Sequence, residues 1–260
     1  MNPVGSDLHV DALLTQLSIG YRNANYIADE LFPLVQVLKR SDIVPKYDQS
    51  HWFRDAALLR GRGTKSKGGG FTVDNSDTYY CHRYSFRYEI ADEDRDNTDA
   101  PYNLDRDGTE FVTDKLQLRR EVSIAADFFT TGIWTGDKTG GTDFTQWSDY
   151  GASTPLEDLS EYRDIVEARI GREPNSFAMG KQVWLQLEHH PDIIDRIKFT
   201  QRGQVSAEIV ASLTGFQLLL IGRAIYTTAV EGTAEASVTY TRVWGKHGLM
   251  LYVPSGPSLM

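Results

Sequence analysis

The stretch Asp105–Trp134, DRDGTEFVTDKLQLRREVSIAADFFTTGIW, decides how the rest of the chain must be arranged. Its apolar residues recur at intervals of three and four, as on one face of an α-helix, and they are Phe111, Leu118, Val122, Ala125, Phe129 and Ile133. No proline interrupts the stretch, and Gly132 with the Gly-rich residues 136–141 ends it. Such a helix would be roughly 40 Å long. A helix of this length with one apolar stripe indicates a spine covered by a thin partner layer.

The first turn of this predicted helix carries residues that favour a helix start. Asp105, Asp107 and Thr109 are candidate N-caps, and Glu110 adds a carboxylate where the helix dipole stabilises negative charge. We therefore expect the helix to begin at or shortly after residue 105.

Length and composition describe an ordinary folded chain. Its 260 residues suffice for one large domain or two modest ones, and 40% hydrophobic and 24% charged residues exclude global disorder. The formal net charge of -9 argues against a dedicated nucleic-acid binder, although not against a protein that encloses nucleic acid. The single Cys81 excludes an intramolecular disulfide and fits a reducing cytoplasm. No apolar run approaches a membrane span and no signal peptide is evident, so we expect a soluble product that stays inside the cell.

The N-terminal residues 1–50 begin with an amphipathic segment and continue into an extended one. Pro33 and the β-rich residues 35–44 after it predict this change of conformation. The segment holds too many apolar side chains for a free tail. Two interpretations stay open: a helix packed on its own domain, or an arm that clamps a neighbouring subunit.

Residues 51–92 have the pattern of two extended limbs joined by a flexible tip. The second limb alternates, with one side formed by Tyr80, His82, Tyr84, Phe86, Tyr88 and Ile90. The tip, GRGTKSKGGG, lacks the order of a phosphate-binding loop. Between residues 54 and 70 the net charge is +4, because Asp55 offsets one of five cations, Arg54, Arg60, Arg62, Lys65 and Lys67. A two-stranded hairpin is only marginally stable alone, so we expect it to lie on something else.

The turn that precedes the spine is acidic. Residues 92–107 carry a net charge of -5, with Arg95 and Arg106 against Asp92, Glu93, Asp94, Asp96, Asp99, Asp105 and Asp107. Paired carboxylates do acid–base chemistry when burial drives their pKa values apart, but the neighbours here are those of a solvated turn. A solvated face, a cation site and an inter-subunit salt bridge remain as alternatives.

Residues 153–253 alternate between predicted helices and strands, which indicates an α/β layer with a small sheet. Glu188, His189, His190 and Asp192 resemble metal ligands, but adjacent histidines on a helix do not chelate as an i, i+4 pair does. We expect these histidines to complement the C-terminal dipole of their helix. Ser176 is not in a G-x-S-x-G elbow, and the sequence presents no catalytic constellation.

Taken in order, these parts resemble the major capsid proteins of tailed double-stranded-DNA bacteriophages. The matching segments are TQLSIGYRNANYIADELFPLVQV, SDTYYCHRYSFRYEIADEDRDN, TEFVTDKLQLRREVSIAADFF, REPNSFAMGKQVWLQLEHHPDIIDRIKFTQRGQVS and AIYTTA…VWGKHGLMLYV. The resemblance implies an α+β fold with an N-terminal arm (1–50), an extended β-hairpin loop (51–92), a peripheral domain with the spine helix (93–149), an α/β axial domain (150–245) and a return to the peripheral domain (246–260). Members usually continue past the segment that matches LYVPSGPSLM. This chain therefore has a shorter tail or is a fragment.

The resemblance implies a structural protein, not an enzyme, with no cofactor and no metal. Its subunits would form the hexamers and pentamers of an icosahedral shell that encloses viral DNA, assembled in the host cytoplasm without a membrane. Portal, scaffolding and decoration proteins are further candidate partners. The alternatives are a nanocompartment shell of the same fold that packages a cargo enzyme, and a metal- or acid-dependent hydrolase. Our candidates for inter-subunit contacts are Arg54, Arg60, Arg62, Lys65, Lys67, Asp92, Glu93, Asp94 and Asp96.

Overall fold

The computed structural model describes residues 12–21, 23–98, 102–198 and 205–254. The described chain forms two compact units. The main unit runs up to Pro33 and again from Ser85 to Val253, and the second, called here the hairpin unit, contains Leu34–Tyr84 and Pro254. Both helices and strands are present, so the mixed fold class expected from the sequence is confirmed. No helix of the described segments is long and apolar enough to cross a membrane.

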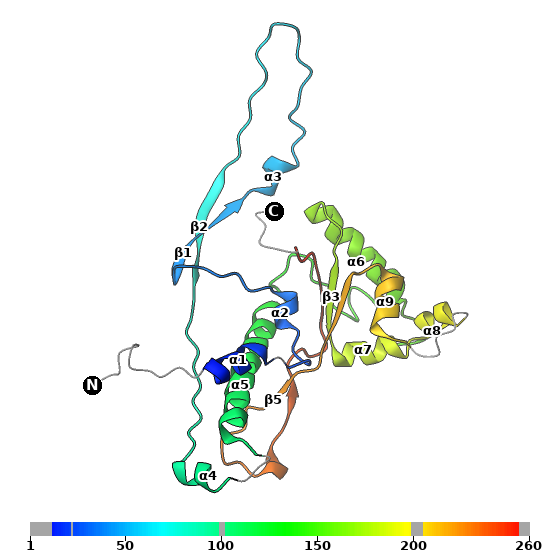
Figure 1. Cartoon of the computed structure of the whole chain (residues 1–260). Helices are drawn as coiled ribbons and strands as arrows, with labels where there is room; N and C mark the ends of the chain where they lie inside the picture. The colour runs from blue at the N-terminus through cyan, green and yellow to red at the C-terminus, as the bar shows by residue number, and fades with distance from the viewer. Residues whose placement is uncertain (1–11, 22, 99–101, 199–204, 255–260) are drawn as a thin grey trace. The chain divides into compact units, whose positions relative to one another are not determined.

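The spine is the helix α5, Leu104–Phe128 (Figure 1). Its 25 residues make it about 37 Å long. The N-cap is Asn103, whose Oδ1 accepts the Arg106 N–H at 3.1 Å. The expected caps Asp105, Asp107 and Thr109 are wrong, because the helix starts before all three and an amide oxygen already caps it. The helix also ends before Trp134, with Phe129 as its C-cap.

The predicted apolar face of α5 is buried only toward its C-terminal end. Ala125 and Phe129 are buried, whereas Phe111 is 43% and Ile133 54% exposed. Phe111 meets the ring edges of Phe86 and Tyr88, with ring centroids 5.7 and 5.8 Å away. The second predicted limb of the hairpin therefore lies, in its last part, against the spine of its own chain. Gly108 allows this approach, since a Cβ there would come within 2.8 Å of the Tyr88 ring.

Two short helices, α1 (Ala12–Gly20) and α2 (Ala28–Leu31), pack on α5. Ser18 and Thr113 exchange a hydroxyl hydrogen bond at 3.0 Å, and Leu31 is fully buried. The described residues between 12 and 33 thus pack on their own unit, as the first interpretation of the N-terminal segment expected.

The second half of the main unit contains a three-stranded sheet of order β4-β3-β7. Parallel to β3 (Ser176–Gly180) runs β4 (Leu218–Gly222), and antiparallel to it runs β7 (Gly248–Leu251). The helices that accompany the sheet are α6 (Pro155–Ile170), α7 (Lys181–Glu188), α8 (Pro191–Ile197) and α9 (Ala207–Thr214). A small hairpin is formed by β5 (Ile225–Tyr226) and β6 (Thr241–Arg242), with a 3₁₀ turn at Glu235–Ser237 between them.

Side chains from alternate positions of the sheet enter two cores, as the period of a strand requires. Phe177 and Met179 belong to the core that the helices α6–α9 share. Ala178 and Leu220 belong to the other, together with Ala125 of α5 and Leu31 of α2. Residues 246–260 were expected to return to the peripheral domain, and 255–260 lie outside the described residues. Within the described part, β7 pairs with β3, and its Leu249 and Leu251 pack against the core that contains Ala125 of α5.

The hairpin unit contains β1 (Ser41–Tyr47) and β2 (Val73–Tyr80), which pair antiparallel, and a single helical turn, α3 (Gln49–Trp52). Pro45, which has no N–H to donate, lies at an irregularity of the ladder. The paired strands begin and end earlier than the two extended limbs expected within 51–92: the first strand is Ser41–Tyr47, the second ends at Tyr80, and residues 54–72 form neither helix nor strand. Figure 1 shows this stretch as a long tip.

Candidate functional site

The hairpin unit buries almost nothing within its own chain. None of its described residues is classed as buried, and both Ile43 and Val44, on opposite sides of β1, are exposed. Only an aromatic group at the base of the tip gives local order, with Phe71 stacked on Trp52 at 5.9 Å between ring centroids and tilted against Tyr47 at 5.6 Å. The two-stranded ribbon thus exposes apolar side chains on both faces and has little burial to stabilise it.

The cations predicted as contact candidates lie along the exposed tip. Arg54, Arg60, Arg62, Lys65 and Lys67 are exposed, and none forms an ion pair with a described residue. Arg60 donates to Ser66 Oγ at 3.3 Å, and Arg54 contributes to a lowered pKa of Asp48, whose largest cause is the hydrogen bond from the Ser50 N–H. The positive charge of the tip is therefore available to another molecule.

The acidic candidates form the helical turn α4, Asp92–Asp96. Arg95 pairs with Asp105 at 2.8 Å and with Asp92 at 3.2 Å, and the hydrogen bond to Asp105 raises the pKa of this guanidinium. Glu93, Asp94 and Asp96 are exposed and form no ion pair with the described residues. These carboxylates are in contact with water, so they lack the desolvation that acid–base catalysis by such a cluster needs. The turn is a solvated face whose negative charge is only partly neutralised by ion pairs.

A buried carboxylate, which sequence reasoning missed, lies in the main unit. The Glu121 side chain is 1% exposed. Its Oε1 accepts the Ile27 N–H at 2.9 Å and the Trp244 Nε1–H at 2.7 Å, and its Oε2 accepts the Ala28 N–H at 2.9 Å. Burial raises the pKa of Glu121, while the three donated hydrogen bonds act in the opposite direction. Its position, four residues before Ala125 on the predicted apolar stripe, was the available signal.

A serine and a histidine that contact each other provide the strongest test for catalysis. Ser153 Oγ lies 2.9 Å from His190 Nε2, the arrangement of a nucleophile and its base. His190 Nδ1, however, accepts the Asp192 N–H at 3.2 Å, so the proton of the neutral ring is on Nε2 and is donated to Ser153. Ser153 in turn donates to the Asp149 carbonyl at 2.6 Å. Both side chains are buried, and Nε2 has no free lone pair to act as a base. The pair is structural.

The expected role of the helix-end histidines is corrected by the same contacts. His190 is the N-cap of α8, not a cation at the C-terminus of α7, and burial lowers its pKa. His189 is exposed at the C-cap of α7, and Glu188 pairs with Lys181 at 3.8 Å. Among the described residues, no group of three or more His, Cys, Asp or Glu side chains could hold a metal.

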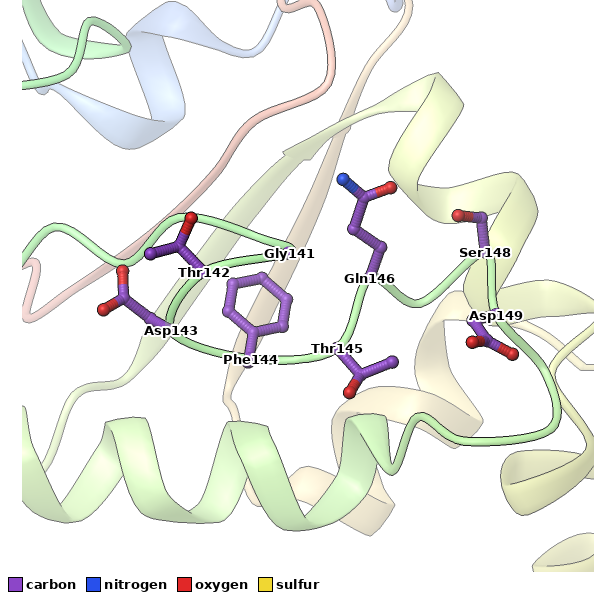
Figure 2. Close-up of a pocket in the computed structure, with 8 residues that line it drawn as sticks. All are labelled: Gly141, Thr142, Asp143, Phe144, Thr145, Gln146, Ser148 and Asp149. Atoms are coloured by element: carbon purple, nitrogen blue, oxygen red, sulfur yellow. The ribbon is translucent and has the colours of Figure 1, made fainter.

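A shallow hollow of about 560 Å³ lies at the loop 141–149 (Figure 2). Figure 2 shows the Phe144 ring inside the bend of this loop. The centroid of this ring lies 5.9 Å from that of Trp147 and 5.8 Å from that of Tyr162. The two acids of the lining bind the backbone of the loop itself: Asp143 accepts the Thr139 N–H at 2.7 Å and Asp149 accepts the Gly151 N–H at 3.2 Å. Both acids of the lining thus order the loop that forms the hollow.

Comparison with known proteins connects this geometry to a class of protein. The chain is 25% identical over 252 residues to the major capsid protein of Burkholderia phage BcepMu, which covers 94% of this chain and 76% of that protein. It is 29% identical over 248 residues to the major capsid protein of Pseudomonas phage JBD67, which covers 94% of this chain and 77% of the relative. The resemblance to phage major capsid proteins predicted from the sequence is confirmed.

A solved structure shares the fold. It is that of a phage-related protein from Bordetella bronchiseptica RB50, with a TM-score of 0.70, 21% identity, and coverage of 96% of this chain and 80% of that one. At this level of identity the likeness shows the fold alone. No family model matches the chain.

Proposed function

We propose, from this similarity to phage major capsid proteins over 94% of the chain, that the protein is a structural subunit of a phage head shell. The observation that carries the proposal is that the likeness to both relatives extends along nearly the whole chain. A local motif would be consistent with many functions, whereas a match over 94% of the chain is consistent with a shared role.

In the proposed shell, copies form hexamers and pentamers through heterologous contacts that close into rings, and the shell encloses viral DNA. Stable interfaces between such subunits each bury more than about 1,000 Å². Assembly takes place in the host cytoplasm, and portal, scaffolding and decoration proteins are its further partners. No residue of the chain needs to act as a catalyst in this role.

The hairpin unit supports a specific mode of contact. None of its described residues is buried, so its apolar faces are in contact with water. Covering these faces with a neighbouring subunit lowers the free energy and favours assembly. The exposed cations of the tip and the unpaired acids Glu93, Asp94 and Asp96 are complementary in sign. We place the tip of one subunit over the acidic turn of the next, where complementary charge fixes the register of the contact more than it adds affinity.

Charge reversal tests this mode of contact. We expect the quadruple variant Arg60→Glu, Arg62→Glu, Lys65→Glu and Lys67→Glu to remain folded and to fail in shell closure. A matched control reverses four exposed cations outside the hairpin unit, Lys138, Arg196, Lys198 and Arg223. Circular dichroism reports folding, and sedimentation with electron microscopy reports closure. If the tip variant assembles as well as the control, the tip charges do not join the subunits.

The two alternatives receive less support. A nanocompartment shell would share the fold, but both relatives found are phage capsid proteins. The contents of purified particles separate the two, because a head contains DNA and a nanocompartment contains a cargo protein. A hydrolase would need a base, and His190, the histidine placed beside a serine, donates its ring proton to that serine.

A further inference from the structure

The segment 23–33, called here the strap, is fixed to the spine by a row of polar side chains on one face of α5. Thr113, Asp114, Gln117, Arg120 and Glu121 recur at intervals of three and four residues, so they lie along one line of the helix surface. Their contacts reach the strap and the residues just before it, and most of them are made to backbone atoms. The spine therefore holds the strap through its main chain more than through its side-chain identities.

The contacts follow the strap in order. Gln117 Nε2 donates to the Tyr21 carbonyl at 2.7 Å, and Gln117 Oε1 lies 3.4 Å from the Asn23 N–H. Asp114 accepts from Asn23 Nδ2 at 3.1 Å and from the Tyr26 hydroxyl at 3.3 Å.

At the far end, Arg120 pairs with Asp29 at 2.7 Å and donates to the Phe32 carbonyl at 3.2 Å. The strap itself contains only the four-residue helix α2 and no ladder hydrogen bond, so its order depends on these polar contacts together with the burial of Ile27, Ala28 and Leu31.

Glu121 differs from the other members of the row because it is buried and carries a charge without a cation. Within the described chain it forms no ion pair, and three N–H groups satisfy it instead. Two of those donors, Ile27 and Ala28, belong to the strap. If the strap leaves α5, the Glu121 carboxylate loses two of its three hydrogen-bond donors. If the carboxylate is replaced, two buried backbone N–H groups lose their acceptor. Either change lowers the stability of the docked strap, because it leaves buried polar groups without partners.

The position of the strap gives this coupling a consequence. The strap ends at Pro33, and the hairpin unit starts at Leu34. The chain passes between the two units at only two points among the residues before Val253, namely 33/34 and 84/85. When the strap is docked, the 33/34 connection is held against α5. When the strap is released, only the 84/85 connection restrains the hairpin unit.

We propose that Glu121 is the latch of a releasable strap, residues 23–33, and that release of the strap frees one of the two connections that restrain the hairpin unit. The buried side chains of Ile27 and Leu31 anchor the docked strap. Glu121 stabilises the docked state further by accepting hydrogen bonds from the N–H groups at the start of α2. This inference concerns the isolated chain and does not depend on shell formation.

The variant Glu121→Gln tests the latch, with Asp127→Asn as the matched control on an exposed position of the same helix. An amide replaces one acceptor oxygen by a donor, so at least one strap N–H loses its partner. By hydrogen exchange with mass spectrometry we expect peptides from 23–33 to exchange at least about tenfold faster, while peptides of β3 and β4 keep their protection. Equal loss across strap and sheet, or no loss in the strap, would overturn the latch.

Two further measurements keep the proposal testable if Glu121→Gln folds poorly or opens only partly. Gln117→Ala removes the contact to the Asn23 N–H at the start of the strap and the contact to the Tyr21 carbonyl just before it, without touching a buried charge. We expect the same peptides to exchange faster. A dye on Cys81, the single cysteine and an exposed residue of the hairpin unit, reports the second part of the proposal. Its anisotropy should fall in Glu121→Gln relative to Asp127→Asn. Faster exchange with unchanged anisotropy would refute the link to the hairpin unit.

Discussion

Replacing Trp244 by Phe isolates the hydrogen bond that joins the C-terminal segment to the spine. Trp244 is 1% exposed, its ring meets the edge of Phe129 at 4.6 Å between centroids, and its Nε1–H donates to Glu121 Oε1 at 2.7 Å. Phenylalanine keeps an aromatic ring in the same place but removes the donor. The change therefore leaves Glu121 with two N–H partners instead of three.

The expected cost has two parts. A hydrogen bond to a charged group contributes about 1.5–3 kcal/mol, and most of this is lost because water does not reach a carboxylate that is 1% exposed. The smaller ring leaves a cavity of roughly 40 Å³, which at about 24 cal/mol per Å³ costs about 1 kcal/mol. We therefore expect the free energy of unfolding to fall by about 2.5–4 kcal/mol. The pKa of Glu121 should rise further, because the lost donor favoured the ionised form.

Urea denaturation followed by circular dichroism measures this loss, with Trp134→Phe as the control. Trp134 also donates its Nε1–H, to the Phe128 carbonyl at 2.8 Å, but it is 38% exposed and water can replace the bond. We expect the control to lose less than about 1 kcal/mol. If Trp244→Phe costs no more than Trp134→Phe, the buried Glu121 network does not stabilise the main unit as argued.

Three further predictions concern charge, protonation and covalent state. Raising the salt concentration should weaken wild-type assembly, since charges at the tip and the acidic turn are screened over about 8–10 Å near physiological ionic strength; an assembly yield independent of salt would contradict this. Burial lowers the pKa of His190 from its ordinary 6.5, so the neutral ring is favoured in the fold and the free energy of unfolding should decline as the pH falls below 6.5. In His190→Asn, whose amide can still cap α8, urea titrations at several pH values should show a smaller decline, and an unchanged pH profile would refute the assignment. An isopeptide crosslink between subunits needs a buried acid beside the lysine, and no such acid was identified beside Lys65 or Lys67. We therefore predict a non-covalent shell. Denaturing gels of particles should show a band near 29 kDa, and a ladder that survives boiling and reductant would contradict this prediction.

The elements that the sequence predicted well are those with local causes. The spacing of apolar residues in α5 and the alternation of helices and strands from Pro155 to Gly222 depend on residues close together in the chain. Helix ends were less predictable. Asn103 caps α5 although three acidic or hydroxyl side chains follow it, because several neighbouring residues are acceptable caps and the local sequence does not choose among them.

Features that depend on distant segments could not be predicted. Glu121 lies 94 and 93 residues from its partners Ile27 and Ala28, and 123 residues from Trp244. A charged residue on an apolar stripe signals a buried contact, but nothing in the local sequence names the donors. The hairpin register failed for the same reason: β2 pairs with 41–47, whereas the alternation of Phe86 and Tyr88 reflects their packing on Phe111.

Electron microscopy of the purified protein tests the proposed shell most directly. At high protein concentration and low salt, we predict closed particles of uniform diameter built from rings of the 29.3 kDa chain. Particles should disappear in the tip variant and persist in the matched control. A chain that stays monomeric across protein and salt concentrations, in preparations whose circular dichroism shows it to be folded, would contradict the account that this protein builds a shell.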